Sequence, residues 1–190
     1  MGELREILMK GLGRLNMKIS NEAKEHVCVL SQGLPHYAHL LGLHATRQAL
    51  DSGMLEIKLE HVKTAINKAV LDTQQSLQSD YRRATTSPQK GNIYGQVLLA
   101  CALARTDEFG YFAAADVRGP LSGVMKKRYE IPSFAKHLHD FCQSVRGAVL
   151  KKSGVKHKFR YRFINPLKQP LVVMKGLVEG KIDETSLQTP

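Results

Sequence analysis

Cations and polar side chains in the second half of the sequence are the residues best placed to do chemistry. Lysine and arginine neutralise the phosphates of nucleic acids, and polar side chains on one helix face can hydrogen-bond to base edges in the major groove. The candidate phosphate contacts are Lys126, Lys127, Arg128, Arg146, Lys151, Lys152, Lys156, Lys158, Arg160 and Arg162. The candidate base contacts are Ser133, Lys136, His137 and Gln143. This combination predicts binding to double-stranded DNA.

The net charge of the chain is concentrated in the same region. The whole sequence has 28 Lys or Arg against 17 Asp or Glu, a formal net charge of +11. Residues 80–168 hold 17 of the basic and 6 of the acidic residues, whereas residues 1–79 hold 9 and 8, and residues 169–190 hold 2 and 3. A near-neutral half joined to a strongly basic one indicates an anionic polymer as the partner of the second half.

Apolar spacing in the basic region predicts three helices followed by a hairpin. The expected elements are a helix over 93–105 capped by Asn92, a short strand at 111–112, a helix over 113–127 broken or kinked at Gly119-Pro120, a helix from Pro132 to about Val145, and strands at 148–150 and 158–163. In the last strand Phe159, Tyr161 and Phe163 alternate with cations. This order is that of a winged helix-turn-helix, which lays its third helix in the major groove. Asp140 on that helix would repel phosphate, so we expect its end to stand away from the DNA.

The first half predicts helices, with a short extended stretch at Leu55 to Leu59 and no strand signal of weight. Ser20 is a suitable N-cap for a second helix, Pro35 for the first turn of a third, and a fourth should reach about Ser76. The polar, aperiodic stretch after it predicts a linker. The expected fold is mainly α with a small β-hairpin, divided into a helical domain at 1–79, a linker at 80–92, a winged helix at 93–175 and a disordered tail at 176–190.

The sequence offers no catalytic or metal site. There is no Gly-rich loop ending in Lys-Ser/Thr and no apolar strand ending in acidic residues, so neither a phosphate cradle nor a magnesium site can be drawn. We therefore expect no enzyme activity and no cofactor for this chain alone. The histidines at 36, 39 and 44 share a helix without a matching ligand cluster, and the three cysteines, at 28, 101 and 142, are expected to be reduced core thiols.

The run Leu30-Ser31-Gln32-Gly33-Leu34-Pro35-His36-Tyr37, with Ile19 to Ala23 before it and Ala45 to Leu50 after it, resembles the lid of AAA+ ATPases of the origin-recognition and replication-initiator clade. In that family an arginine at the opening of the third lid helix reaches the nucleotide phosphates, and the matching residue here is His36, which is shorter and mostly neutral. The resemblance implies a four-helix lid before a DNA-binding winged helix. It also implies a missing N-terminal ATPase core that holds ATP and Mg²⁺, and a homo-oligomer is possible for the intact protein.

Two other interpretations stay open. The winged helix could hold a partner protein, as in an accessory ATPase of transposition or phage defence. Alternatively, the chain could be a transcription regulator with an effector pocket or a dimer interface in residues 1–79. The amino terminus lacks a secretion signal and no apolar run approaches the ~20 residues of a membrane span, so we expect a cytoplasmic protein that does not bind membranes.

Overall fold

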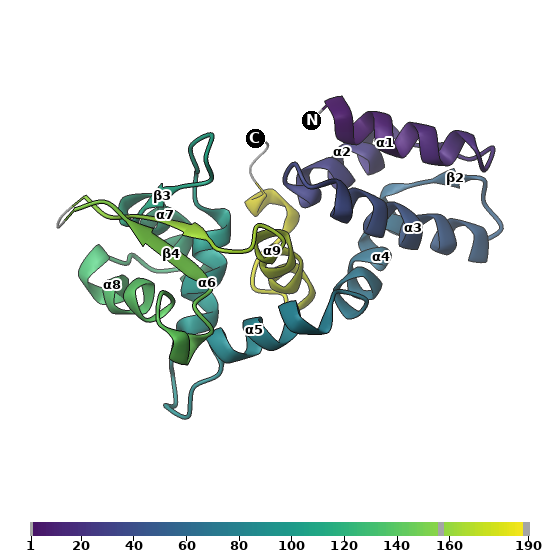
Figure 1. Cartoon of the computed structure of the whole chain (residues 1–190). Helices are drawn as coiled ribbons and strands as arrows, with labels where there is room; N and C mark the ends of the chain where they lie inside the picture. The colour runs from purple at the N-terminus through teal and green to yellow at the C-terminus, as the bar shows by residue number, and fades with distance from the viewer. Residues whose placement is uncertain (1, 156–157, 188–190) are drawn as a thin grey trace. The chain divides into compact units, whose positions relative to one another are not determined.

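The computed structural model describes residues 2–155 and 158–187 (Figure 1). The protein is mainly helical, with a small antiparallel sheet of three strands and a parallel pair of two-residue strands. It divides into two compact units, the first formed by residues 1–73 with 177–190 and the second by residues 74–176.

The first unit is a group of helices around an apolar core. Its elements are α1 (Gly2–Gly13), β1 (Lys18–Ile19), α2 (Asn21–Ser31), α3 (Pro35–Asp51), β2 (Glu56–Ile57), α4 (Leu59–Leu71) and the 3-10 helix η2 (Glu184–Ser186). Tyr37 and Leu41 of α3 are fully buried, and burial raises the pKa of Tyr37 to about 12. The face of α3 that they occupy is therefore the centre of this unit.

The predicted helix starts of the first unit are confirmed. Ser20 caps α2, where its Oγ accepts a hydrogen bond from the Ala23 N–H at 3.2 Å, and Pro35 is the first residue of α3. Left-handed backbone at Gln32 (φ 46°) and Gly33 (φ 80°) ends α2 and turns the chain into α3. Local capping chemistry, which is visible in the sequence, sets these boundaries.

Several expectations for residues 1–92 are wrong. β1 pairs with β2 in parallel, Lys18 opposite Glu56 and Ile19 opposite Ile57; β2 lies within the extended stretch expected at Leu55 to Leu59, whereas the sequence predicts no strand at β1. The fourth helix, α4, ends at Leu71 rather than near Ser76. A further helix, α5 (Gln75–Thr85), takes up the first half of the expected linker. The polar surface of α5 explains the difference, since only Leu77 and Ala84 of its residues are buried.

The second unit has the expected order of helices and strands. After α5 come α6 (Tyr94–Leu103), β3 (Phe112–Ala113), α7 (Ala114–Met125), α8 (Ile131–Asp140), the 3-10 helix η1 (Ser144–Arg146), β4 (Leu150–Ser153), β5 (Arg160–Phe163) and α9 (Lys168–Val178), which runs two residues into the first unit. The sheet order is β3-β5-β4 with antiparallel pairing throughout. The sheet and the helices share a core that includes Phe112, Phe134 and Leu121, all fully buried.

Details of the second unit differ from the prediction. Helix α7 is continuous through Pro120, so the expected break is wrong, and α6 is capped at Ile93 rather than at Asn92. Helix α8 ends at Asp140, which leaves Val145 outside it and 77% exposed. Strand β4 begins at Leu150 because Ala148, expected in the strand, has left-handed backbone (φ 44°).

The expected tail at 176–190 also differs from the structure where the structure describes it. Helix α9 continues to Val178 and η2 spans Glu184–Ser186. Ile182 between them is 8% exposed, and Glu184 lies 3.0 Å from the Lys63 ammonium of α4. Residues 177–187 are thus part of the first unit rather than a separate extension.

Candidate nucleic-acid interface

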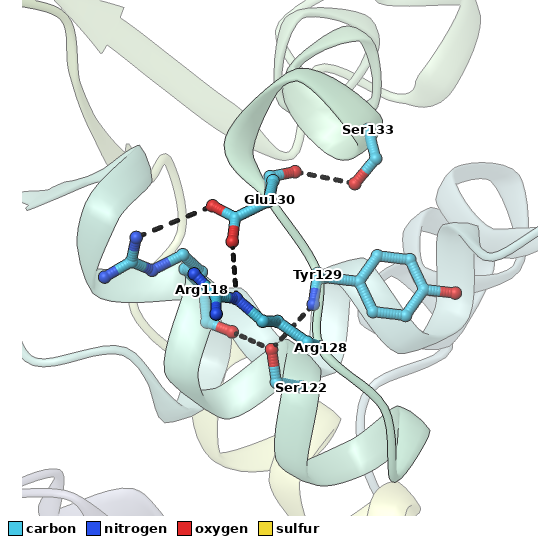
Figure 2. A network of polar contacts seen from close by, with 6 residues as sticks. All are labelled: Arg118, Ser122, Arg128, Tyr129, Glu130 and Ser133. Carbon is cyan, nitrogen blue, oxygen red and sulfur yellow. Dashed lines mark hydrogen bonds and ion pairs between the residues drawn. The ribbon is translucent and has the colours of Figure 1, made fainter.

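A polar network in the turn between α7 and α8 fixes the start of α8 (Figure 2). Glu130, the N-cap of α8, accepts a hydrogen bond from Arg128 Nε at 2.7 Å, and its other carboxylate oxygen lies 3.6 Å from Arg118 Nη1. The Arg128 hydrogen bond is the main reason why the pKa of Glu130 is lowered. Ser133 Oγ donates to the Glu130 carbonyl at 2.6 Å. The carboxylate of Glu130 therefore holds the connection between α7 and α8, and its carbonyl holds the first helical turn of α8.

The same turn is tied back to α7. Ser122 Oγ accepts from the Tyr129 N–H at 3.0 Å and donates to the Arg118 carbonyl at 2.8 Å (Figure 2). Lys126, the C-cap of α7, has left-handed backbone (φ 51°) and projects as an exposed residue. Residues 126–130 thus form a short turn, held by side-chain hydrogen bonds, between α7 and α8.

Helix α8 has one buried and one exposed face. Phe134 and Leu138 are fully buried, as is Phe141 just after the helix. Ser133 and Lys136 are exposed on α8 as predicted, whereas Gln143, predicted on the same helix, is exposed three residues after its end. His139 is exposed as well, with its Nε2 3.4 Å from Gln143 Nε2, and our sequence reasoning missed it. Its position three residues after Lys136 and four before Gln143 could have revealed it.

His137 and Asp140 do not point freely into solvent. The His137 ring packs edge-on against the Tyr94 ring of α6 at 4.6 Å between centroids, and burial lowers the pKa of His137. Tyr94 donates its hydroxyl to Asp140 Oδ2 at 2.6 Å, which raises the pKa of Tyr94. Asp140 is thus engaged in joining α8 to α6, and His137 is a weaker candidate for reading bases than its place on the helix indicated.

Arg146 is also engaged inside the unit. Its guanidinium lies 3.7 Å from the centre of the Tyr94 ring, and its Nη1 donates to the Thr86 carbonyl at 2.6 Å. These contacts connect η1 with α6 and with the segment after α5. Arg146 therefore has a positioning role for α8, which its charge alone does not indicate.

Replacing Arg146 with leucine is expected to lower the free energy of unfolding by about 2 kcal/mol, because a charged hydrogen bond and a cation–π contact are lost together. Urea unfolding of the full chain followed by circular dichroism would measure this. Arg47→Leu is the control, since Arg47 is exposed on α3 and arginine and leucine have similar helix propensities, so the midpoint should change little. Equal midpoints for both variants would contradict a structural role for Arg146.

The hairpin divides its cations between the two faces of the sheet. Lys152 is paired with Tyr161 and so shares its face, on which Tyr161 and Phe163 are buried. Lys151 is paired with Arg162 on the opposite, outer face, and Arg160 also lies there. On the same face as Lys152, the Leu150 N–H at the start of β4 donates to the carbonyl of Phe141, the residue after α8, at 3.1 Å. The expected alternation along β5 is confirmed, but its cations do not all share the side of α8.

The predicted contacts therefore fall into groups. Exposed positions on α8, just after it, on the turn before it and on the hairpin are occupied by Ser133, Lys136, Gln143, Lys126, Lys127, Lys151, Lys152 and Lys158. Arg128 is exposed but paired with Glu130. Arg146 and His137 pack against Tyr94. Arg160 and Arg162 lie on the outer face of the sheet. Lys156 lies outside the described residues. DNA contact by the first group stays a prediction.

In the first unit, His36 is exposed at the start of α3, edge-on to the Tyr37 ring at 5.1 Å. His39 is exposed too, whereas His44 is 5% exposed with its Nε2 3.1 Å from Asp72 Oδ2. In the part of the chain that the structure describes, no three His, Cys, Asp or Glu side chains are grouped to hold a metal ion. Cys28 and Cys101 are free and fully buried, and burial raises the pKa of both.

Every helix within residues 2–155 and 158–187 is too short or too polar to cross a lipid bilayer. Comparisons with protein-family models, with curated proteins and with solved structures found no match to this chain.

Proposed function

We propose that the second unit is a winged helix that binds double-stranded DNA, with α8 in the major groove. The observation that carries the proposal is the exposed stripe of Ser133, Lys136 and His139 on α8, with Gln143 exposed just after the helix and a hairpin with exposed lysines following it. The element order α6, β3, α7, α8, β4, β5 supports it. Lysines would contact phosphates, while Lys136 could donate to guanine N7 or O6.

Most of the cations that would face the DNA are not paired with any carboxylate that the structure describes. Lys126, Lys136, Lys152 and Lys158 have no carboxylate at ion-pair distance among the described residues. Glu130, the carboxylate nearest the start of α8, is already paired with Arg118 and Arg128. A polyanion approaching this side would therefore meet cations whose charge is not neutralised within the unit.

Titration of a labelled duplex at two salt concentrations tests this proposal. If about four phosphates are neutralised, raising the salt from about 50 mM to about 200 mM should weaken binding roughly 100-fold, since each contact adds about 0.9 to the slope of log K against log salt. Weak binding at low salt with a shallow slope would reject DNA binding. It would favour the alternative in which this winged helix docks a partner protein of an accessory ATPase.

We also propose that the first unit serves as the lid of a larger AAA+ ATPase, so that nucleotide binding in a separate core sets the position of the lid and, through it, of the DNA-binding unit. Gly33 with left-handed backbone, Pro35 at the first position of α3 and the exposed His36 support this. An in-frame phosphate-binding loop upstream in the gene is the expected finding. If one exists, His36→Arg in the whole protein should tighten ATP binding, and His36→Ala should leave it unchanged.

A further inference from the structure

The outer face of the three-stranded sheet combines cations with aromatic side chains. Along β5, Tyr161 and Phe163 point into the core, so Arg160 and Arg162, which alternate with them, point outward. The register adds Lys151, opposite Arg162, to the same face. Tyr111 precedes the buried Phe112 of β3 and so also lies on the outer face.

Tyr111 is held at the centre of this face by several contacts. The Arg162 guanidinium lies 5.0 Å from the centre of the Tyr111 ring. Arg160 Nη2 donates to the Tyr111 carbonyl at 3.2 Å, and the Tyr111 N–H donates to Asp107 Oδ1 at 2.8 Å. The backbone on both sides of the ring is thereby fixed, and Tyr111 itself remains only partly buried. A ring fixed in this way loses little freedom when a flat ligand stacks on it.

The charge of the face is positive. Asp107 lies 3.1 Å from Arg160 and offsets its charge, whereas Arg162 and Lys151 have no ion-pair partner among the residues described by the structure. Phe109, in the turn that leads into β3, is 68% exposed and its N–H is also held by Asp107. Cations beside partly exposed aromatic rings are suited to a ligand with phosphates and unsaturated flat rings.

We propose that this outer face binds single-stranded nucleic acid, with an unpaired base stacked on Tyr111 and Arg162 and phosphates near Lys151. The inference goes beyond duplex binding by α8, because it concerns the opposite face of the sheet. Bases within a duplex are stacked on one another and cannot reach Tyr111, so the surface should discriminate between the two forms. An acidic polypeptide would be attracted by the same charges but would have no base to stack.

A tryptophan at position 111 gives a direct test, since the sequence contains no Trp and the new side chain would be its only indole. In Tyr111→Trp, fluorescence should be quenched by an oligothymidylate of about 15 nucleotides, and much less by a duplex of the same length or by polyglutamate. Anisotropy with the labelled oligothymidylate should show that Tyr111→Leu weakens binding about 10-fold and that Tyr111→Trp preserves it. Circular dichroism checks that each variant is folded.

Lys136→Gln separates this proposal from the duplex proposal. It should weaken duplex binding while it leaves oligothymidylate binding within about 2-fold, and Tyr111→Leu should do the reverse. Unchanged oligothymidylate binding by a folded Tyr111→Leu would overturn the proposal. If polyglutamate quenched the indole of Tyr111→Trp as strongly as oligothymidylate does, the proposal would also be overturned, in favour of an acidic protein partner.

Discussion

Replacing Asp80 with alanine is expected to lower the free energy of unfolding by roughly 2–3 kcal/mol. Asp80 of α5 lies 2.8 Å from the ammonium of Lys168, whose side chain is only 9% exposed at the start of α9. Removing the carboxylate leaves that ammonium buried without a counter-charge, which typically costs about 3–5 kcal/mol. We expect a smaller cost than this because the Asp80 side chain is 38% exposed, so water can partly replace the missing carboxylate.

Urea unfolding of Asp80→Ala, Lys168→Met and the double variant forms a cycle that isolates the pair. In the Lys168→Met background the loss of Asp80 should cost little, since no buried ammonium remains. Glu25→Ala serves as the control, because its partner Arg5 and Glu25 itself are 46% and 43% exposed and such surface pairs contribute less than about 1 kcal/mol. An equal cost for Asp80→Ala in both backgrounds would show that the ion pair is not the cause.

Reversing the charge of Lys136, as in Lys136→Glu, is expected to weaken duplex binding roughly 100-fold at low salt, because a contact in the major groove is replaced by repulsion. Arg162→Glu makes the same change of net charge on the outer face of the sheet. It should weaken duplex binding less than about 5-fold, since that face is turned away from the core side, where the Leu150 N–H donates to the Phe141 carbonyl just after α8.

Anisotropy titration of both variants against the same labelled duplex gives the comparison. Equal losses would mean that the duplex responds to net charge alone and that α8 makes no particular contact. A loss confined to Arg162→Glu would place the duplex on the outer face and contradict both proposals together.

Sequence reasoning succeeded where a local signal decides the structure. Ser20, Pro35 and Pro132 mark helix starts because capping and the fixed φ of proline act within one turn. The gap between α4 and α5 was missed because it contains neither glycine nor proline. Thr73 Oγ1 instead donates to the Ala69 carbonyl at 2.9 Å, beside the end of α4.

The features that the sequence did not predict depend on contacts between residues far apart in the chain. The pairing of β1 with β2 joins residues far apart in the chain, and two-residue strands carry no periodic pattern. Arg146 looked like a phosphate contact because charge is visible in sequence, but its Tyr94 ring and Thr86 carbonyl are not. Period-two alternation correctly separated Arg160 and Arg162 from Tyr161 and Phe163, yet it could not say on which side of the sheet α8 would lie.

The return of residues 177–187 to the first unit changes how the protein can be dissected. An expression fragment that stops at residue 175 would end α9 in mid-helix and remove Ile182 and Glu184 from the unit that contains Lys63. Conversely, a chain nicked between residues 73 and 74 would still carry, on its downstream piece, a segment that packs within the upstream one. We therefore expect a fragment of residues 1–73 to need the 177–190 segment in trans, as in fragment complementation.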